Sequence, residues 1–294
     1  MKILKFVSGS LLLYFLFFST GTQLSGCSPD PIFDTVYVKD TLILKDTLIV
    51  KDTLTIRDTV DCNCYDLKDG LVAWYNFNGG TLKDSSGNNN HIVFNNATTT
   101  TGRYGNANSA YLFNGSSSYM RIPNSASLNP TNAITLSAVI KVNGFYNGTC
   151  HGNQIIVKTS NIDKDNGLYG MTFNDHKCPG NIDTSKTRFW AVYGDALGAN
   201  SSAEADTVPV KIGQWYSIVY TYENYTSKFY INGELKQSRK FSAFSFIPNA
   251  GDLYFGRMPD QQYPNWLNAA IDDIRIYNRA LCDGEVKQLN RVKD

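Results

Sequence analysis

The chain has 294 residues, with 27 Lys and Arg against 26 Asp and Glu, so its formal charge is only +1. This balance provides no basic surface for a phosphate backbone, and we expect no nucleic-acid partner. With 42% apolar residues, the chain is too hydrophobic to be disordered throughout. Its 13% aromatic content favours β-structure, because aromatic side chains fit a half-buried pleated surface.

The N-terminus has the pattern of an export signal. Lys2 and Lys5 precede an apolar run over 6–18, which is shorter than the roughly 20 residues that span a bilayer. The string LSGC that ends at Cys27 resembles the lipobox of bacterial lipoproteins, in which this Cys becomes the lipid-bearing first residue. We therefore predict a signal peptide over 1–26 and a lipid anchor on Cys27. The alternative is an ordinary cleaved signal with an incidental thiol.

The lipid anchor predicts a location in the cell envelope, at the outer membrane. The residues after Cys27 read SPDP and depart from the acidic cluster that marks surface export in lipoproteins resembling those of Bacteroidetes. Either leaflet of that membrane is therefore open.

Residues 27–61 form a predicted stalk that contains a six-residue repeat. From position 33 the chain reads FDTVYV, KDTLIL, KDTLIV, KDTLTI and RDTV. Six residues rotate an α-helix by about 600°, which spreads the apolar positions around it, whereas a strand keeps the same faces in every repeat. We therefore predict an extended stalk that lifts the following domain clear of the membrane surface.

Two further hypotheses concern this stalk. An isolated strand with apolar groups on both faces tends to pair with copies of itself, which would give a homo-oligomer. Alternatively, the Asp-Thr-aliphatic triplets resemble acceptor sites for O-glycosylation in Bacteroidetes, and glycans there would solvate the apolar faces and block pairing. The candidate acceptors are Thr35, Thr41, Thr47, Thr53 and Thr59.

Residues 62–294 have the rhythm of an all-β domain. Short alternating segments such as LVAWYNF, AITLSAVIKV and WYSIVYTY are separated by clusters of Gly, Asn, Asp and Ser. This spacing predicts a sandwich of two antiparallel sheets. Asn232-Gly233, between KFYI and ELKQ, predicts a tight hairpin turn. Residues 283–292 have helical character.

Four motifs of this domain carry a family resemblance. In chain order they are GLVAWYNFNGGTLKDSSGNNNH, GRYGNANSAYLFNGSSSYMRIPNSASLN, GQWYSIVYTYENYTSKFYINGEL and IDDIRIYNRALCDGEVKQL. They resemble the laminin-G-like, concanavalin A-like jelly-roll domains of bacterial surface proteins, over about residues 66–294. The resemblance implies two curved sheets in a jelly-roll sandwich, a face or rim able to hold saccharide and, in many members, one structural calcium ion. It does not by itself imply an activity.

The calcium ion implied by the resemblance has a candidate site in a turn. Residues 84–90 contain one carboxylate, three Asn and a Gly, and Ca²⁺ prefers such hard oxygen ligands. The resemblance brings this turn towards the last strand, so the nominated ligands are Asp84, Asn88 and Asp273. The same residue types also form ordinary turns.

Sugar recognition needs flat apolar surfaces beside polar groups. Trp74 and Trp215 lie inside strand patterns, and we expect them in the core. The stretch 259–266 combines two aromatic residues with polar ones, and its two prolines mark it as a loop. The predicted ligand-binding residues are Tyr146, Trp190, Tyr263 and Trp266.

Catalysis of the jelly-roll glucanase type is not expected. Those enzymes use a Glu-x-Asp-x-x-Glu strand, because a retaining glycosidase needs two carboxyls about 5 Å apart. The stretch from Glu204 begins the pattern, but Pro209 occupies its last position. We therefore predict a non-catalytic, membrane-anchored head that binds a glycan or glycosylated surface. The alternatives are a protein-binding or structural component of a surface assembly and, second, a different glycoside hydrolase.

Five cysteines follow Cys27, and an exported chain meets an oxidising periplasm. Cys150 and Cys178 flank a long polar excursion and are predicted to pair. The resemblance implies that the first and last strands lie side by side, which makes Cys64 the partner of Cys282. Cys62 is then left over, and three alternatives stay open: a cross-link between chains, a free thiol, or pairing of Cys62 with Cys282.

Overall fold

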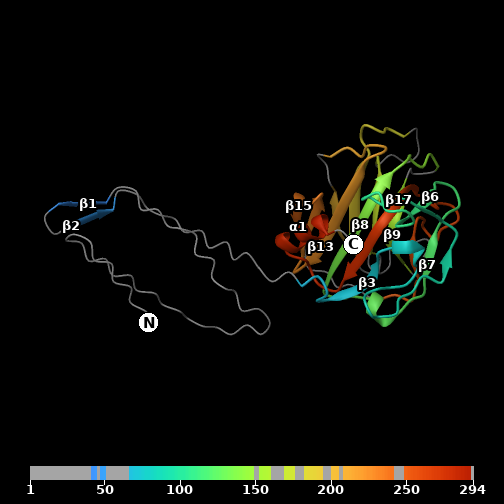
Figure 1. Ribbon diagram of the computed structural model, residues 1–294, viewed down its shortest axis with the longest axis horizontal. Coiled ribbons are helices and arrows are strands. Elements are labelled where there is room, and N and C mark those ends of the chain that lie inside the picture. Colours follow the sequence, from blue (N-terminus) through green and yellow to red (C-terminus); the bar gives the residue numbers. More distant parts are fainter. Residues whose placement is uncertain are drawn as a thin grey trace. The chain divides into compact units, whose positions relative to one another are not determined.

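The structure of the chain is a computed structural model, drawn as a ribbon in Figure 1. For residues 41–44, 47–50 and 200–204 it describes the backbone only. The chain divides into two units, residues 1–64 and 65–294. The described residues are 41–44, 47–50, 66–148, 152–159, 169–175, 182–194, 200–204, 208–241 and 248–292.

The described part of the first unit is a pair of strands from the repeat tract. β1 (Thr41–Leu44) pairs antiparallel with β2 (Thr47–Val50), with Thr41 opposite Val50. Both segments are extended, as the six-residue period predicts, and they run in opposite directions. The register sets Leu42 opposite Ile49 and Ile43 opposite Leu48, so both sides of this pair carry apolar residues.

Several predictions for the first unit fall outside the described residues. They concern the signal peptide over 1–26, the lipid anchor on Cys27, and the acceptor sites other than Thr41 and Thr47, and they stay predictions. Among the residues that the structure does describe, no helix is both long and apolar enough to cross a membrane.

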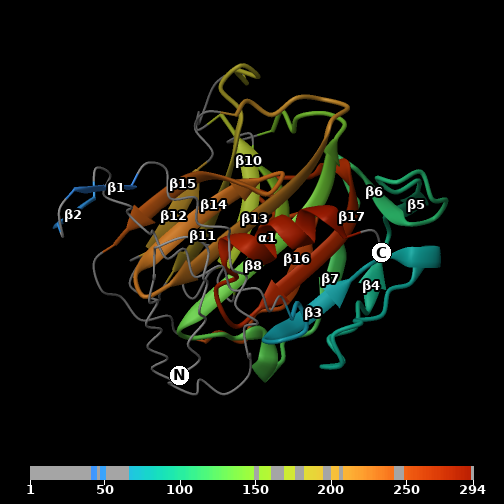
Figure 2. The ribbon, with the colours of Figure 1, turned by 60° about the vertical axis from the view of Figure 1, so that its left-hand side comes forward.

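The second unit is a sandwich of two antiparallel sheets, as predicted (Figure 2). Within its described residues, seven strands pair in the order β12-β11-β10-β9-β16-β7-β4. The second sheet has the order β15-β14-β13-β8-β17-β6-β5, and β3 also pairs with β17. The strands of the first sheet are β4 (Phe94–Asn95), β7 (Met120–Ile122), β9 (Asn153–Lys158), β10 (Tyr169–Asn174), β11 (Arg188–Gly194), β12 (Asn200–Glu204) and β16 (Leu253–Phe255).

The strands of the eight-stranded sheet include the longest of the described chain. They are β3 (Leu71–Tyr75), β5 (Thr98–Thr100), β6 (Ala110–Asn114), β8 (Ala133–Val142), β13 (Trp215–Glu223), β14 (Thr226–Ile231), β15 (Glu234–Lys240) and β17 (Asn268–Tyr277). Two single 3-10 turns, Asn78–Gly80 and Ala126–Leu128, lie in the connections. The antiparallel pairing of β3 with β17 confirms that the first and last strands of the head are neighbours.

The core lies between the two sheets and is rich in aromatic rings. Phe173 and Phe189 of the seven-stranded sheet meet edge to face at 5.6 Å, and Phe189 meets Tyr216 of the eight-stranded sheet at 5.0 Å. All three side chains are buried. Each large buried side chain stabilises the fold by about 1.5 to 3 kcal/mol relative to its exposed state. The sheets are therefore joined by packing along their facing sides.

The expected core positions of Trp74 and Trp215 are wrong. Their strand neighbours Tyr75 and Tyr216 are buried in the core, so alternation turns both tryptophans to the outer side of the eight-stranded sheet. Both are half-buried there, and the Nζ atom of Lys141 lies 5.4 Å from the centre of the Trp215 ring.

The hairpin turn and the C-terminal helix are confirmed. Asn232 and Gly233 have φ of 53° and 80°, the left-handed values that a two-residue hairpin turn requires. The helix α1 (Asp283–Arg291) places Val286 and Leu289 in an apolar cluster with residues of β13, β14 and β17, and Figure 2 shows it lying across the eight-stranded sheet.

Cys282, just before α1, is half-buried and is a free thiol, which contradicts its predicted pairing with Cys64. Cys150 and Cys178 lie outside the described residues, and their disulfide stays a prediction.

Candidate functional site

The outer side of the seven-stranded sheet carries a row of large side chains. Leu253 and Phe255 of β16 point into the core, so Tyr254 between them points outward. Tyr254 is paired in register with Arg121 of β7, which is paired in turn with Phe94 of β4. The pleat therefore aligns three outward side chains across three adjacent strands.

Four aromatic rings contact one another on this side of the sheet. Phe94 stacks on Tyr119 with 4.5 Å between ring centres, and Tyr119 lies 6.3 Å from Tyr254 and 6.3 Å from Trp266. These four rings are partly exposed. We call the set Phe94, Tyr119, Tyr254, Arg257 and Trp266 the aromatic face.

The aromatic face continues across the sheet to Trp190. Val157 of β9 and Val192 of β11 form a buried pair, against which Trp190, Tyr254 and Met258 pack. Two of the predicted ligand-binding residues, Trp190 and Trp266, therefore lie on the same outer side of one sheet. Tyr254 connects them.

The segment between β16 and β17 is a loop, as predicted, and it contributes Arg257 and Trp266 to the aromatic face. Hydrogen bonds within the loop hold its conformation. The buried Asp260 accepts hydrogen bonds from the backbone N–H groups of Gln262 at 2.6 Å and Tyr263 at 3.1 Å. Backbone bonds from Met258 to the Pro264 carbonyl and from Leu267 to the Gly256 carbonyl, of 2.8 and 3.0 Å, join its two arms. A loop fixed in this way loses little conformational freedom when a ligand binds.

The other two predicted ligand-binding residues, Tyr263 and Tyr146, are not members of the aromatic face. Tyr263 belongs to the loop just described, where its hydroxyl accepts a bond of 3.2 Å from the amide of Gln262. Tyr146 lies in the loop after β8, and its backbone N–H donates to the side chain of Asn153 at 2.8 Å. In the described part of the chain, the Tyr146 ring makes no ring contact with the aromatic face.

Sequence reasoning missed four members of the aromatic face, namely Phe94, Tyr119, Tyr254 and Arg257. The signal for Tyr119 and Tyr254 was present, because each neighbours a core residue in a short alternating segment. Phe94 carried no such signal, since β4 has only two residues and shows no periodicity.

Charged groups beside the aromatic face are paired or buried. Arg121 bonds to Asp252 at 2.9 Å, and this bond raises the pKa of the Arg121 guanidinium. Lys158 is fully buried and donates to the carbonyl oxygens of Asn249 and Gly251 at 3.0 and 2.8 Å. Burial lowers the pKa of Lys158 to about 8.

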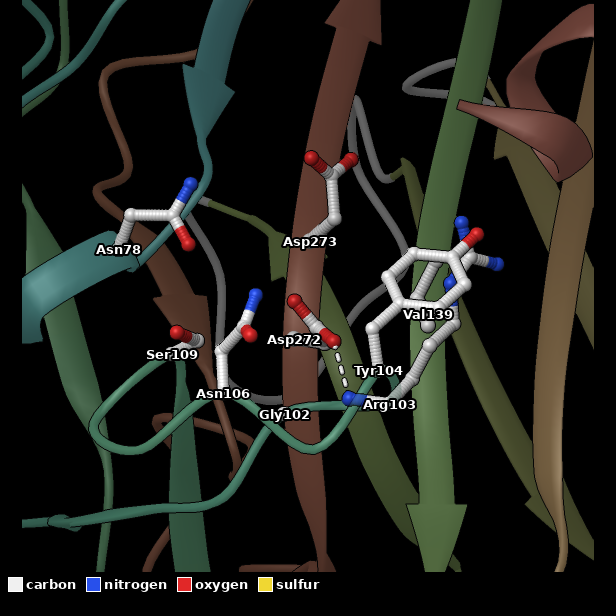
Figure 3. Close-up of a pocket in the computed structure, with 9 residues that line it drawn as sticks. All are labelled: Asn78, Gly102, Arg103, Tyr104, Asn106, Ser109, Val139, Asp272 and Asp273. Atoms are coloured by element: carbon white, nitrogen blue, oxygen red, sulfur yellow. Dashed lines mark hydrogen bonds between the residues drawn. The ribbon is translucent and has the colours of Figure 1, made fainter. Parts of the chain in front are cut away.

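A small hollow of about 10 Å³ lies beside β17, away from the aromatic face (Figure 3). A register shift between Ile271 and Asp273 lets two consecutive carboxylates, Asp272 and Asp273, line it. Figure 3 shows the Asp272 carboxylate turned towards the backbone N–H of Arg103, which donates to it at 2.5 Å. Asn78, Asn106 and Ser109 supply further polar groups.

The nominated calcium ligands are occupied by hydrogen-bond donors. Asp84 Oδ1 accepts from the backbone N–H groups of Trp74 and Ser86 at 2.9 and 2.8 Å, and Oδ2 accepts from Asn90 N–H and Ser86 Oγ–H. Asp273 accepts from the Trp74 indole at 2.8 Å and pairs with Arg275 at 3.1 Å. Trp74 thus donates to both carboxylates, through its backbone N–H to Asp84 and through its indole N–H to Asp273.

This arrangement does not fit a calcium ion, which takes six to eight oxygen ligands. Asn88 turns its amide nitrogen, a donor, to the carbonyl oxygens of Leu71 and Val72 at 3.0 Å each. Across the described ranges there is no group of three or more His, Cys, Asp and Glu side chains placed to hold a metal. Calcium binding stays a prediction.

The fold resembles several solved binding domains. The binding domain of Paraclostridial Mosquitocidal Protein 1 has a TM-score of 0.58 at 19% identity, over 76% of this chain and 52% of that one. The botulinum neurotoxin serotype D binding domain has a TM-score of 0.57 at 18% identity, over 76% of this chain and 51% of that one. The chain therefore spans about half the length of these two domains.

A third similar structure is matched over almost its whole length. It is domain 4 of AbnA, a GH43 extracellular arabinanase from Geobacillus stearothermophilus, in complex with arabinotriose. Its TM-score is 0.54 at 23% identity, over 75% of this chain and 98% of that one. At these identities the likeness concerns the fold.

At the level of sequence, no curated protein matches the chain significantly. Residues 114–287 match the family described as the concanavalin A-like lectin/glucanases superfamily. This match spans more than half of the chain and falls within the two-sheet head. The chain belongs to the concanavalin A-like lectin/glucanase superfamily.

Proposed function

We propose that the head is a non-catalytic carbohydrate-binding domain and that its ligand lies on the aromatic face. The observation that carries this proposal is the contact of four partly exposed aromatic rings on one side of a sheet. Such rings provide flat apolar surface for the C–H groups of a sugar, and neighbouring polar groups can bond to its hydroxyls. The similar arabinanase domain, which was solved with arabinotriose, supports the same kind of ligand.

The contacts of two glutamates support binding without bond cleavage. Glu234 is bonded to Lys236 at 2.6 Å, and Glu285 is bonded to Arg279 at 2.6 Å. Each carboxylate has a cationic partner on the eight-stranded sheet or at α1, away from the aromatic face. A retaining glycosidase instead needs two carboxyls about 5 Å apart across the scissile bond.

A glycan array followed by calorimetry on the purified protein tests this proposal. We expect Trp266→Ala to weaken binding of the selected glycan about tenfold or more, since stacking and buried area are both lost. Trp215→Ala is the matched control, because Trp215 is also a half-buried tryptophan beside a cation but lies on the other sheet. Equal losses in both variants, or no glycan bound at all, would contradict the proposal.

We also propose that Cys27 carries a lipid that holds the head at the outer membrane, where it meets a glycan or glycosylated surface. The lipobox-like string before Cys27 supports this location. In cell fractionation, we expect Cys27→Ala to move the protein from the membrane to the soluble fraction. A protein that stays with the membrane after this substitution would contradict the anchor.

A further inference from the structure

Arg257 is held in place within the aromatic face. Its guanidinium carbon lies 4.7 Å from the centre of the Trp266 ring and 5.2 Å from the centre of the Tyr119 ring. Its Nε donates to the Met258 carbonyl at 2.6 Å, and Nη2 donates to the Asp260 carbonyl at 3.3 Å. The guanidinium is therefore held beside both rings by bonds to its own loop.

The charge of Arg257 has no carboxylate partner among the described residues. The nearby Asp252 is bonded to Arg121, and the Asp260 carboxylate accepts the loop N–H groups instead. Its Nη1 makes no hydrogen bond to the described part of the chain. The guanidinium of Arg257 is therefore the charged group of the aromatic face.

A guanidinium held in this way, with N–H groups on Nη1 and Nη2 that do not bond to the loop, can donate two parallel hydrogen bonds to an anion with two neighbouring oxygens. Carboxylate is the group of this kind that sugars commonly carry, and two parallel N–H···O bonds from arginine both strengthen and orient the contact. The neighbouring rings of the aromatic face supply the apolar surface for the sugar ring itself. The guanidinium and the aromatic rings therefore both fit a sugar that carries a carboxylate.

We propose that the ligand of the aromatic face is an acidic polysaccharide, and that Arg257 binds the carboxylate of a uronic acid residue. This inference rests on the proposed function, since it names the class of glycan that the face accepts. Arg257 then selects charged over neutral sugars, while the rings supply affinity that both kinds share.

The test compares each acidic polymer with its own methyl ester, which keeps the sugars and linkages but removes the charge. Polygalacturonate, alginate and hyaluronate present different uronic acids, and the full-length protein is titrated with both forms of each. We expect one acid form to bind about tenfold or more tighter than its ester. Raising the salt from about 0.05 M to about 0.5 M should reduce this difference.

Variants separate recognition from a structural role of the arginine. We expect Arg257→Gln to bring the acid-to-ester ratio close to one while binding of the ester persists, and Arg257→Lys to give an intermediate ratio because a point charge replaces the fork. Arg239→Gln is the control, since Arg239 lies in the edge strand β15 of the other sheet, with its guanidinium carbon 5.6 Å from the centre of the Phe241 ring. Its ratio should equal that of the unmodified protein.

Each outcome decides between the two proposals. If the unmodified protein binds esters or neutral glycans as tightly as acids, the acidic ligand is wrong but carbohydrate binding stands. If Arg257→Gln leaves the acid-to-ester ratio unchanged, Arg257 is not the contact. If no polysaccharide binds in either form, both proposals fail.

Discussion

A buried carboxylate that accepts several N–H groups fixes the backbone that supplies them, and Asp84 does this for residues 84–90. We expect Asp84→Ala to lower the free energy of unfolding by about 2 kcal/mol or more, because buried donors are left unsatisfied. Urea unfolding in the presence of a chelator measures this loss. If the substitution destabilises the protein only when calcium is present, Asp84 is a calcium ligand instead.

The same turn shows where sequence reasoning stops. Its composition identifies a turn correctly, and the resemblance places it near the last strand. Asp and Asn serve equally as metal ligands and as turn formers, however. Only the contacts of Asp84 and Asn88, which face N–H donors and carbonyl oxygens, distinguish the two roles.

At the scale of elements, an ion pair between Arg279 and Glu285 links the segment after β17 to the first turn of α1. Arg279 donates to both oxygens of Glu285 at 2.6 and 2.9 Å, and Glu285 also accepts the Cys282 N–H at 2.8 Å. Burial by itself would raise the pKa of Glu285, but the bonds from Arg279 and Cys282 lower it. The contribution of this pair is therefore present above the ordinary pKa of a glutamate and is lost as the pH falls through the lowered value.

We expect Arg279→Met to cost about 3 kcal/mol of unfolding free energy, because it leaves a largely buried carboxylate without its cation. The double variant Arg279→Met with Glu285→Gln should lose less, since the unpaired charge is gone while the bond to the Cys282 N–H remains possible. Denaturant unfolding of the unmodified protein, both single variants and the double variant completes the cycle. A double variant that loses more than Arg279→Met would contradict this account.

The strands differ in how well the sequence predicted them. β8, β13 and β17 are long and apolar, and the sequence indicated all three. Residues 153–158 of β9 read NQIIVK, which does not alternate between apolar and polar positions, and all six are buried in the structure, so no period-two pattern predicts this strand. The outward side of the first sheet, and hence the aromatic face, could not be assigned without the pairing of β9, β16 and β7.

At the scale of the whole molecule, buried tyrosines set the response to alkaline pH. Burial raises the pKa of Tyr222 and Tyr277 to about 12, and it also raises those of Tyr169, Tyr193 and Tyr230. The unfolded chain loses these protons near pH 10, whereas the folded protein keeps them. The stability they contribute is therefore complete below about pH 10 and falls as the pH rises towards 12.

We expect denaturant unfolding at a series of pH values to show this decline. Lys158 acts in the opposite sense between about pH 8 and 10.4, because its lowered pKa makes the unfolded state bind more protons there. Tyr277→Phe should show a smaller loss between about pH 10 and 12 than the unmodified protein. An identical pH dependence in the two proteins would mean that Tyr277 does not titrate as described.

The two sheets pack their facing sides together and leave two different outer sides, one bearing the aromatic face and the other bearing α1. A structure of the protein with an oligosaccharide selected on the array tests most directly which side is functional. We predict sugar rings against Tyr119, Tyr254 or Trp266. A ligand bound in the hollow beside Asp272, or on the eight-stranded sheet, with the aromatic face bare, would contradict the account.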